Sequence, residues 1–519
     1  MWIATAAHAH RLDDRAEELY GLSTDILIER AGQSVRDAIL EMLPEGGRVT
    51  FFCGKGNNGA DGLYAATLVH QTGLGVEVLM THSEDELNAH ALAHLTNLRA
   101  QGIDPIFPSD PQWLTKAGCV ACRDLVVDSV LGTGARGDVA DAVRAAIRSM
   151  NEGGLPVISV DVPSGIVADS GEELGESVWA SCTITMGLPK QCFFQGIGIE
   201  HSGAWRVADL GYPDELLREP TSARLIDREW VCDLLPDRLR SSHKGDHGHV
   251  LIVAGSAAMP GAAVLAAQAA LRAGAGLVTV AGIESVVRAV SQRLPEALLL
   301  VLPEREGCIS PLAVEPLLAA SQRATSVVFG PGLSDWLPVT QFLADLWPRW
   351  DIPSVIDADA LNAVSRGVTL PPGECVLTPH PGEMGRLMHC SAAEIQSRRF
   401  SIVEAAVQKF ERTILLKGAY SIVGSMMQPL NVNPTGNPGM ATGGMGDVLS
   451  GLLGTLLAQD LPPYLAASCG AYWHGLAADL CAEEIGPQGY LASEVAAKLP
   501  AARAKITAPC PSEDSCQLP

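Results

Sequence analysis

The strongest chemical signal in this 519-residue chain is the stretch NPTGNPGMATGGMGDVLSG. Five of its glycines precede a helix expected to begin near Asp447: Gly436, Gly439, Gly443, Gly444 and Gly446. Exposed backbone N–H groups and the positive end of that helix would face one anionic point, such as a phosphate. The carboxylate of Asp447 would repel the phosphate unless it is a general base that takes the proton from a hydroxyl attacking a phosphoryl group. The alternative is that Asp447 only caps the helix.

A second glycine-rich turn, FFCGKGNNGADGL, follows a strand and precedes a helix in the first half of the chain. It carries three glycines and three polar residues: Gly54, Gly56, Gly59, Asn57, Asn58 and Asp61. The context is that of a phosphate-binding turn, although neither GxGxxG nor a terminal GK[ST] is present. Glycines permit close backbone approach, and the oxygen atoms favour a bound cation. The alternative is a turn whose side chains only cap the next helix.

Two more strand ends in the first half carry polar residues. Asp128 precedes the loop Gly132, Thr133, Gly134, Ala135, Arg136, Gly137 and Asp138, and Asp161 precedes Pro163, Ser164 and Gly165. Parallel strand ends converge on one crevice, so three aspartates, with Asp61, favour shared chemistry over separate helix caps. Lys190 either supplies positive charge to a phosphate or is a solvated surface lysine.

Several short motifs of the second half fit a kinase-like site. They contain Lys244, Asp246 and His249 (KGDHGH), Gly261 and Ala262 (GSAAMPGAA), Gly330 and Gly332 (FGPGL), His380 and Glu383 (TPHPGEM), and Lys417 and Ser421 (KGAYS). Small residues would let a flat ring approach, and KGAYS would lie near a nucleotide's phosphates. His380 could equally be a satisfied loop histidine and Lys417 a surface charge. The motif DADALN contributes Asp357, Asp359 and Asn362, which either bind water molecules of a magnesium ion or cap a helix. The sequence does not decide between these two roles.

Two series of apolar strand-like runs, each alternating with alanine-rich helical periods, would position these residues. The first has strands at 49–53, 76–80, 124–130, 156–162 and 182–187, and helices at 14–43, 60–72, 84–101 and 138–150. The second has strands in HVLIVAGS, LVTVAG, LLLVLP, SVVFGPG, PSVIDADALN, CVLTPHPGEM and TILLKGAYSIVG, and helices at 261–274, 392–410 and from 446 onward. A polar break near 211–240 separates them. We expect two doubly wound α/β domains with ligands at the carboxyl ends of parallel strands.

Composition narrows the function classes. The chain is 47% hydrophobic and 18% charged, which indicates a globular protein, and its net charge of −23 disfavours binding to nucleic acid or anionic lipid. We expect no membrane span, a cytoplasmic location and a reducing compartment for the 13 scattered cysteines. The CxxC of Cys119 and Cys122 and the cluster of His243, His247 and His249 are interpreted as structural rather than metal-binding.

Together these motifs resemble the bifunctional NAD(P)H-hydrate repair enzymes, an NAD(P)HX epimerase joined to an ADP-dependent dehydratase. GNNGxDG, Asp128 with its glycine loop, and DVPSG resemble the epimerase signature; KGDHG, TPHPGEM, KGAYS and NPGMATGGMGD resemble the dehydratase signature. Ala60 departs from the usual glycine, and its methyl group could narrow the ligand's approach. The resemblance implies a Rossmann-like epimerase domain at 1–215 and a ribokinase-like dehydratase domain at 236–505. The polar, proline-bearing composition of 216–235 predicts a linker, and the composition of 506–519 predicts a disordered tail.

The resemblance also implies ligands for individual residues. The hydrated dinucleotide would contact Asn57, Asn58, Gly59, Ala60, Asp61, residues 132–138 and Asp161 in the epimerase, and potassium would bind Asn58, Asp128 and Ser164. In the dehydratase, Ala262, Gly332, His380 and Asp447 would contact the hydrate, while Lys417, Gly418, Ala419, Tyr420, Ser421 and Gly446 would hold ADP. Asp161 and Asp447 are the expected catalytic residues, and magnesium is expected at the phosphoryl transfer.

The implied substrates are NADHX, NADPHX and ADP, handled by a homo-oligomer. Phosphorylation of the ring hydroxyl would convert a poor leaving group into phosphate. Two rival functions remain: a small-molecule kinase of the ribokinase type, disfavoured by TPHPGEM and the attached first domain, and a non-catalytic dinucleotide-binding module, disfavoured by the strand-end aspartates.

Overall fold

The computed structural model describes residues 1–118 and 124–509, and the chain divides into two compact units, Met1–Ala223 and Arg224–Pro519. Cys119 and Cys122 lie outside the described residues, as does 510–519 of the predicted tail. The start of that tail was predicted too early, because residues 506 and 507 end a helix in which Ile506 is buried. The segment expected to be a linker contains short elements, among them β8 (Ala223–Leu225) and α9 (Arg228–Leu234).

The first unit is built on a parallel sheet in the order β3-β2-β4-β5-β6-β7. Its strands are β2 (Arg48–Cys53), β3 (Gly75–Met80), β4 (Leu125–Ser129), β5 (Val157–Val160), β6 (Cys182–Met186) and β7 (Ala204–Ala208), whereas the short β1 (Trp2–Ile3) does not belong to this sheet. The central strands are almost wholly buried, as expected for a sheet covered on both faces. The strand order reverses at β2, so the loops after β2 and β4 diverge and leave a crevice at their carboxyl ends.

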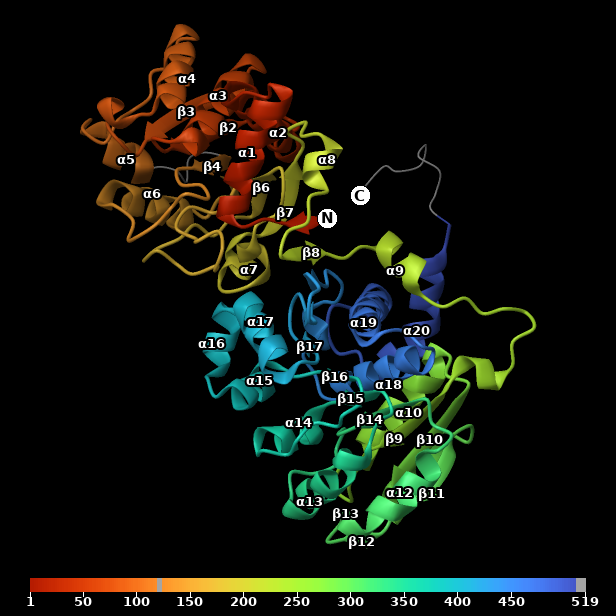
Figure 1. Ribbon diagram of the computed structural model, residues 1–519. Helices are drawn as coiled ribbons and strands as arrows, with labels where there is room; N and C mark the ends of the chain where they lie inside the picture. Colours follow the sequence, from red (N-terminus) through yellow and green to blue (C-terminus); the bar gives the residue numbers. More distant parts are fainter. Residues whose placement is uncertain (119–123, 510–519) are drawn as a thin grey trace. The chain divides into compact units, whose positions relative to one another are not determined.

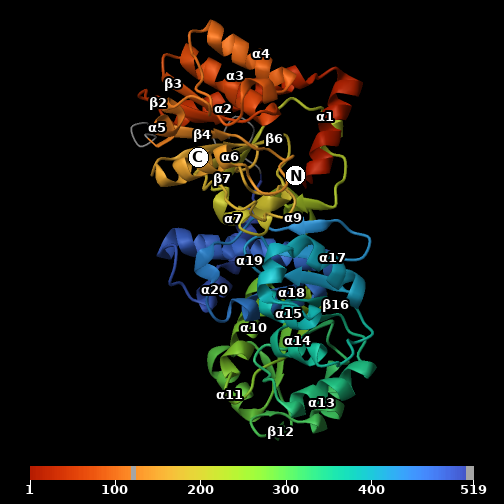
Figure 2. The same ribbon diagram turned by 90° about the vertical axis from the view of Figure 1, so that its left-hand side faces the viewer.

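Helices cover both faces of this sheet (Figures 1 and 2). One hydrophobic cluster joins the sheet to α1 (Ala6–Tyr20), α2 (Thr24–Met42), α3 (Asn57–Gln71) and α4 (Ala89–Ala100), and another joins it to α5 (Gln112–Gly118) and α6 (Asp141–Glu152). α7 (Gly198–His201) and α8 (Asp214–Leu217) are single turns. The predicted helix at 14–43 is two helices, because Gly21, at φ +69, ends α1 in the left-handed conformation.

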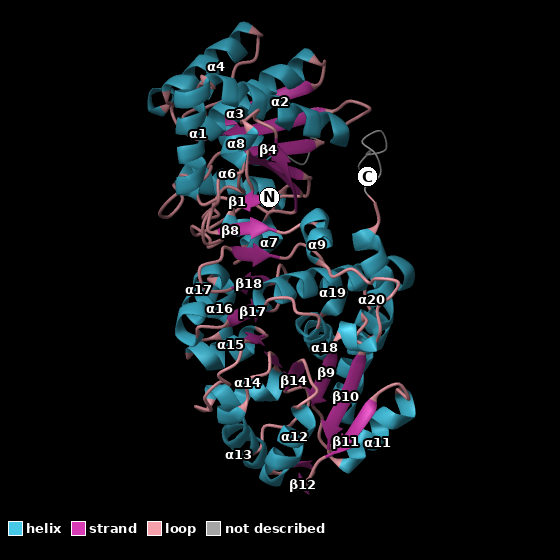
Figure 3. Ribbon diagram, turned by 45° about the vertical axis from the view of Figure 1, so that its right-hand side comes forward, coloured by secondary structure: helices cyan, strands magenta, loops and turns pink. Residues whose placement is uncertain are grey.

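The second unit contains a larger sheet in which the order β19-β18-β17-β16-β15-β14-β9-β10-β11 reverses between β9 and β14 (Figure 3). Its parallel strands are β9 (His249–Val253), β10 (Leu277–Gly282), β11 (Leu298–Val301), β14 (Ser326–Phe329), β15 (Ser354–Ile356), β16 (Cys375–Leu377) and β17 (Thr413–Leu416). β18 (Ile422–Gly424) and β19 (Leu430–Val432) are antiparallel, so TILLKGAYSIVG forms a hairpin. β12 (Glu304–Arg305) pairs with β13 (Cys308–Ile309).

The α-helices of the second unit differ in length, from six to 23 residues. After α9 they are α10 (Pro260–Ala273), α11 (Glu284–Arg293), α12 (Val314–Ser321), α13 (Leu337–Leu346), α14 (Ala358–Ser365), α15 (Pro381–Met388), α16 (Ala392–Ser397), α17 (Arg399–Phe410), α18 (Met445–Ala458), α19 (Pro463–Ile485) and α20 (Ala492–Thr507). A Cβ at Gly451 of α18 would lie 2.0 Å from the carbonyl oxygen of Ala266 in α10, so small residues let these helices touch. Within the described ranges, no helix combines the length and hydropathy needed to cross a membrane.

Candidate functional site

Gly54 and Gly59 of the first unit's turn serve the close packing of α3, whereas a Cβ at Gly56 would meet only open space. A Cβ at Gly54 would lie 1.9 Å from the carbonyl oxygen of Val130, and one at Gly59 would lie 2.0 Å from that of Gly54. Only glycine therefore lets α3 begin so close to the loop after β4. The sequence interpretation, in which these glycines make room for a ligand, is replaced by one in which they make room for the protein's own backbone.

Asn58 is the polar residue of this turn that is left free to bind. Both atoms of its side-chain amide are buried and have no hydrogen-bond partner in residues 1–118 and 124–509, which is costly unless a ligand or ion completes the site. A Cβ at Gly132 would lie 3.3 Å from the Asn58 Cβ and 3.6 Å from an Asp161 carboxylate oxygen. Residues 58, 132 and 161, expected at three different strand ends, are thus brought together. Asn57 is exposed and accepts a hydrogen bond from the Asn88 amide at 2.7 Å.

Asp161 is held under strain directly after β5. Its φ of +67 lies in the left-handed region, which a residue other than glycine adopts at a cost of about 1 kcal/mol or more. The Lys190 ammonium donates to its carboxylate at 2.5 Å and to the Met186 carbonyl at 2.8 Å. The Lys190 side chain is 1% exposed, so of the two alternatives for this residue the solvated surface lysine is wrong. Lys190 holds the Asp161 carboxylate in a buried ion pair.

Two residues missed by the sequence reasoning extend this cluster. The Tyr212 hydroxyl donates a hydrogen bond to the Asp13 carboxylate. Burial, opposed by this bond, raises the pKa of Asp13, and burial together with the Asp161 and Asp13 charges raises the pKa of Asp61 well above its usual range. The sequence offered no signal for Asp13 and Tyr212, because 199 residues separate them and neither belongs to a motif.

Asp128 and Ser164 lie in direct contact beneath this crevice. The Ser164 hydroxyl and backbone N–H donate to the two oxygens of Asp128 at 2.5 and 2.8 Å, the Ser159 hydroxyl donates at 2.8 Å, and the Val130 N–H at 3.3 Å. Burial raises the pKa of Asp128, and these hydrogen bonds oppose that rise. Asp128 and Ser164 supply only oxygen atoms, which is the ligand type that a hard cation prefers, but in this structure these atoms are buried and bonded to the protein itself.

Other predicted residues of the first unit lie either in the exposed loop after β4 or in the hydrophobic core. Arg136, Gly134 and Asp138 are exposed in the loop after β4, where Gly137 has a φ of +73. Ala60 is completely buried within the hydrophobic cluster that joins α3 to the sheet. Its methyl group therefore faces the core and does not narrow a ligand's approach.

Lys417 and Asp357 form the centre of the second unit's site, after β17 and β15. The Lys417 ammonium donates to Asp357 at 2.8 Å and lies 3.8 Å from Glu383, and the Ser450 hydroxyl donates to the other Asp357 oxygen at 2.6 Å. Although burial opposes it, the charges of Asp357 and Glu383 raise the pKa of Lys417. The lysine side chain is 19% exposed, so it is not a free surface charge.

Asp447 is the third residue of α18 and, within the described part of the chain, differs from its neighbours in having no cation bound to it in an ion pair. Gly444, at φ +90, is the helix cap, and no side chain makes a cap hydrogen bond there, which argues against a capping role for Asp447. Burial and the charge of Asp357 raise the pKa of Asp447 to about 7. A Cβ at Gly446 would lie 3.3 Å from the Lys417 Nζ, so the lysine sits beside the start of α18. The arrangement places a carboxylate that can accept a proton beside a cation and beside the exposed N–H groups at the start of a helix.

His380 caps α15 and still presents one ring nitrogen. Its Nδ1 accepts hydrogen bonds from the backbone N–H groups of Gly382 and Glu383 at 3.0 and 3.4 Å. The backbone N–H of His380 donates to the Glu383 carboxylate at 2.7 Å. Burial and the Lys417 charge lower the pKa of His380. A neutral ring with Nδ1 as acceptor carries its proton on Nε2, which lies 3.5 Å from a Glu383 carboxylate oxygen and can donate to that oxygen or to a ligand.

The other motif residues of the second unit lie at different strand ends, and this decides whether they join the site. Ala262 and Gly332 lie against each other, because a Cβ at Gly332 would come within 2.9 Å of the Ala262 methyl. Asp359 accepts from the Ser334 N–H at 2.8 Å and from the Asn362 amide at 3.3 Å. Lys244, Asp246 and His249 precede or begin β9, at the amino end of the strand, and so do not join the site.

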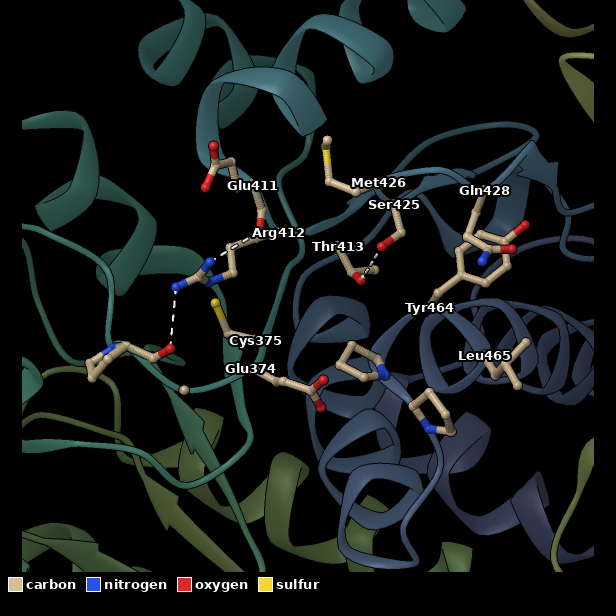
Figure 4. A pocket seen from close by; sticks show the side chains of 14 residues that line it. Glu374, Cys375, Glu411, Arg412, Thr413, Ser425, Met426, Gln428, Tyr464 and Leu465 are labelled. Carbon is tan, nitrogen blue, oxygen red and sulfur yellow. Dashed lines mark hydrogen bonds between the residues drawn. The ribbon is translucent and has the colours of Figure 1, made fainter.

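A hollow of about 490 Å³ lies at the opposite ends of these strands (Figure 4). Cys375 and Thr413, the first residues of β16 and β17, line it together with Glu374, Arg412 and Tyr464. His380 and Lys417 follow the carboxyl ends of the same two strands. The hollow is therefore separate from the candidate dehydratase site.

Comparisons with known proteins match both units in succession. The family model described as "YjeF-related protein N-terminus" matches residues 24–192, and the model described as NAD(P)H-hydrate dehydratase matches residues 250–501. The bifunctional NAD(P)H-hydrate repair enzyme Nnr of Moorella thermoacetica is 37% identical over 96% of this chain and 96% of its own length. The enzyme of the same name from Coxiella burnetii is 38% identical over 92% of this chain and 94% of its own length.

Solved structures resemble the second unit. A ribokinase-like superfamily protein from Enterococcus faecalis superposes with a TM-score of 0.50 and 26% identity, covering 56% of this chain and 98% of that one. An ADP/ATP-dependent NAD(P)H-hydrate dehydratase from Bacillus subtilis, co-crystallised with ATP/Mg²⁺, has a TM-score of 0.49 and 31% identity over 54% of this chain and 97% of that one. The ribokinase-like fold expected for the second half is confirmed.

Proposed function

The chain belongs to the bifunctional NAD(P)H-hydrate repair enzymes, which join an epimerase to a dehydratase, and we propose how the residues of each unit perform its reaction. The first unit epimerises R and S NAD(P)HX, and the second dehydrates the S epimer to NAD(P)H. The full-length relatives and the dehydratase model favour this function over that of a ribokinase-type kinase.

In the dehydratase, Asp447 is the proposed general base. It takes the proton from the hydroxyl on ring carbon 6 as the hydroxyl oxygen attacks the terminal phosphorus of ADP, and the bond from phosphorus to the bridging oxygen breaks to release AMP. The C6–O bond then breaks with loss of a proton from C5, which releases phosphate and restores the double bond. A pKa of about 7 keeps a large fraction of Asp447 deprotonated at neutral pH.

The nucleotide and the hydrate are assigned to the strand ends around Asp447. ADP would be held by the turn of residues 417–421 and by Gly446, with the Lys417 ammonium near its phosphates. The hydrate would contact Ala262, Gly332 and the Nε2–H of His380. Asp359, which keeps lone pairs beyond its two hydrogen bonds, fits as a residue that holds magnesium through water. Magnesium, when bound, offsets the charge of the diphosphate.

In the epimerase, Asp161 moves a proton at the reacting carbon while Lys190 fixes its position. Asn58, Gly132 and Asp161 surround the proposed site, with residues 57–61 and 132–138 as dinucleotide contacts. Potassium would bind Asn58, Asp128 and Ser164, where it fixes the substrate's phosphate against acidic surroundings.

One observation carries the proposal: Asp447, with its pKa of about 7, lies beside Lys417 at an open glycine-rich helix start. The test is to mix the purified protein with hydrated NADH and magnesium, with and without ADP, and to follow the return of reduced-nicotinamide absorbance. ADP-dependent return, with AMP and phosphate as products, supports the proposal. Return without any added nucleotide contradicts it.

Domain limits, assembly and location are also proposed. Residues 1–215 and 236–505 would each retain their reaction as separate fragments, since each contains all the parallel strands that carry its own site. The edge strand β11 exposes Leu298, Leu299 and Val301, which supports a homo-oligomer, testable by light scattering. Buried thiols inside strands, such as Cys53 and Cys375, support a reducing location, the cytoplasm.

A further inference from the structure

Arg399, the first residue of α17, is a buried cation that the proposed mechanism does not use. Its side chain is completely enclosed, at 1% exposure, and no ion pair in the described ranges includes it. Burial lowers the pKa of Arg399 to about 10, so the guanidinium remains charged at neutral pH. A buried charge without a counter-ion is costly, so its retention calls for a role.

The guanidinium lies directly beneath the turn assigned to ADP. Its terminal nitrogens lie 3.4, 3.5 and 3.3 Å from the carbonyl oxygens of Leu416, Lys417 and Tyr420, and 2.6 Å from the Gln396 amide oxygen. Gly418, at φ +138, leaves room for it, because a Cβ there would lie 2.8 Å from Nη1.

These contacts fix the direction of the turn's peptide units. The described chain has no cis peptide, and in a trans peptide the C=O and the following N–H point in opposite directions. Because the Lys417 and Tyr420 carbonyls face Arg399, the N–H groups of Gly418 and Ser421 face away from it, toward the outer side of the turn. Two outward N–H groups above a buried cation form an anion-binding surface.

We propose that Arg399 is a positioning residue for the nucleotide: it turns the carbonyls of residues 416–420 inward, so that the turn presents N–H groups and net positive potential to the diphosphate of ADP. This inference rests on the proposed assignment of that turn to ADP. Arg399 does not touch the nucleotide, and the reacting atoms are left to Asp447.

The test compares Arg399→Met and Arg399→Lys with a matched control, Arg412→Met. Arg412 also bonds main-chain carbonyls, those of Glu411, Pro371 and Pro372, but at the opposite end of β17 (Figure 4). We expect Arg399→Met to raise the KM for ADP about tenfold or more, with kcat changed less than about threefold, and to reduce the rise in melting temperature caused by magnesium-ADP. Arg399→Lys should show a smaller rise in KM, and Arg412→Met none.

The possible outcomes separate this inference from the function on which it rests. Wild-type protein without ADP-dependent dehydration would remove the proposed function itself. An ADP-dependent wild type whose Arg399→Met variant keeps its KM and its response to ADP would overturn the role of Arg399 alone. If Arg399→Met does not fold, Arg399→Lys decides: an unchanged KM contradicts the inference, and a raised KM at unchanged kcat supports it.

Discussion

The two units each bury a lysine–aspartate pair at the carboxyl ends of parallel strands, but they use it differently. In the first, the Lys190 ammonium bonds Asp161, the carboxylate proposed for the chemistry, at 2.5 Å. In the second, the Lys417 ammonium bonds Asp357 at 2.8 Å, and no cation among the described residues forms such a pair with Asp447.

The difference suits two reactions. A carboxylate fixed against a lysine keeps one geometry, which suits a base that must move a proton at one defined position beside the reacting carbon. A carboxylate with a pKa of about 7 can accept a proton at neutral pH, and the lysine beside it remains available to a phosphate. In a chain of net charge −23, a phosphate needs such a local cation.

The largest effect is expected from Asp447→Asn. The amide keeps the shape of the side chain but cannot accept a proton, so dehydration should fall by about 100 to 10,000-fold. ADP binding and epimerisation should change little. Asp161→Asn in the other unit is the control, with normal dehydration of the S epimer. A variant that retains most of its rate at saturating ADP would leave Asp447 without a catalytic role.

Lys190→Met should mainly reduce the stability of the first unit. Loss of one partner from a buried ion pair leaves an uncompensated charge and costs about 3–5 kcal/mol. Denaturant unfolding measures this cost. The double variant Lys190→Met with Asp161→Asn should recover part of the stability without recovering epimerisation. Equal unfolding free energies for wild type and Lys190→Met would show that the pair does not hold the site together.

The pH dependence should separate the two sites. Asp447 must be deprotonated to act, and its raised pKa of about 7 means that the active form increases as pH rises through that value. The kcat for dehydration should therefore rise about tenfold between pH 6 and pH 8. Epimerisation measured on the same samples serves as the control. A dehydration rate that is flat over this range would contradict the assignment.

The smallest structural effect is expected from Asn58→Ala, because the Asn58 amide atoms have no partner among the described residues. We expect a change in unfolding free energy within about 0.5 kcal/mol, with loss of the epimerase response to potassium.

Asp128→Ala should impair epimerisation and also destabilise the unit, since Asp128 accepts four hydrogen bonds. Full epimerisation by wild type in potassium-free buffer, or when a bulky organic cation replaces potassium, would remove the ion from the mechanism.

The sequence predicted both α/β folds because strand and helix periods are local properties. It could not separate two kinds of glycine: Gly54 and Gly59 pack against backbone, whereas Gly443 has open space around it. It also missed the antiparallel β18, since the turn at Gly418 and Tyr420 depends on positive φ values that residue type alone does not reveal.

The residues of the candidate sites were predictable only where they belong to short sequence motifs. Asp447 and Lys417 belong to glycine-rich or strand-end motifs, and the structure brings both to one edge of the sheet. Lys190 could not be placed, because whether a lysine is buried depends on the loop that covers it. Asp13 and Tyr212 meet only through the tertiary fold.

The central claim is that the first unit supplies the epimer that the second consumes, and the most direct measurement is the extent of NADH recovery from a mixture of both epimers with excess ADP. Wild type should recover both epimers. Asp161→Asn should recover the S fraction at the wild-type rate and the rest far more slowly, and added fragment 1–215 should restore complete recovery. Complete recovery by Asp161→Asn alone, at the wild-type rate, would contradict the division of labour between the two units.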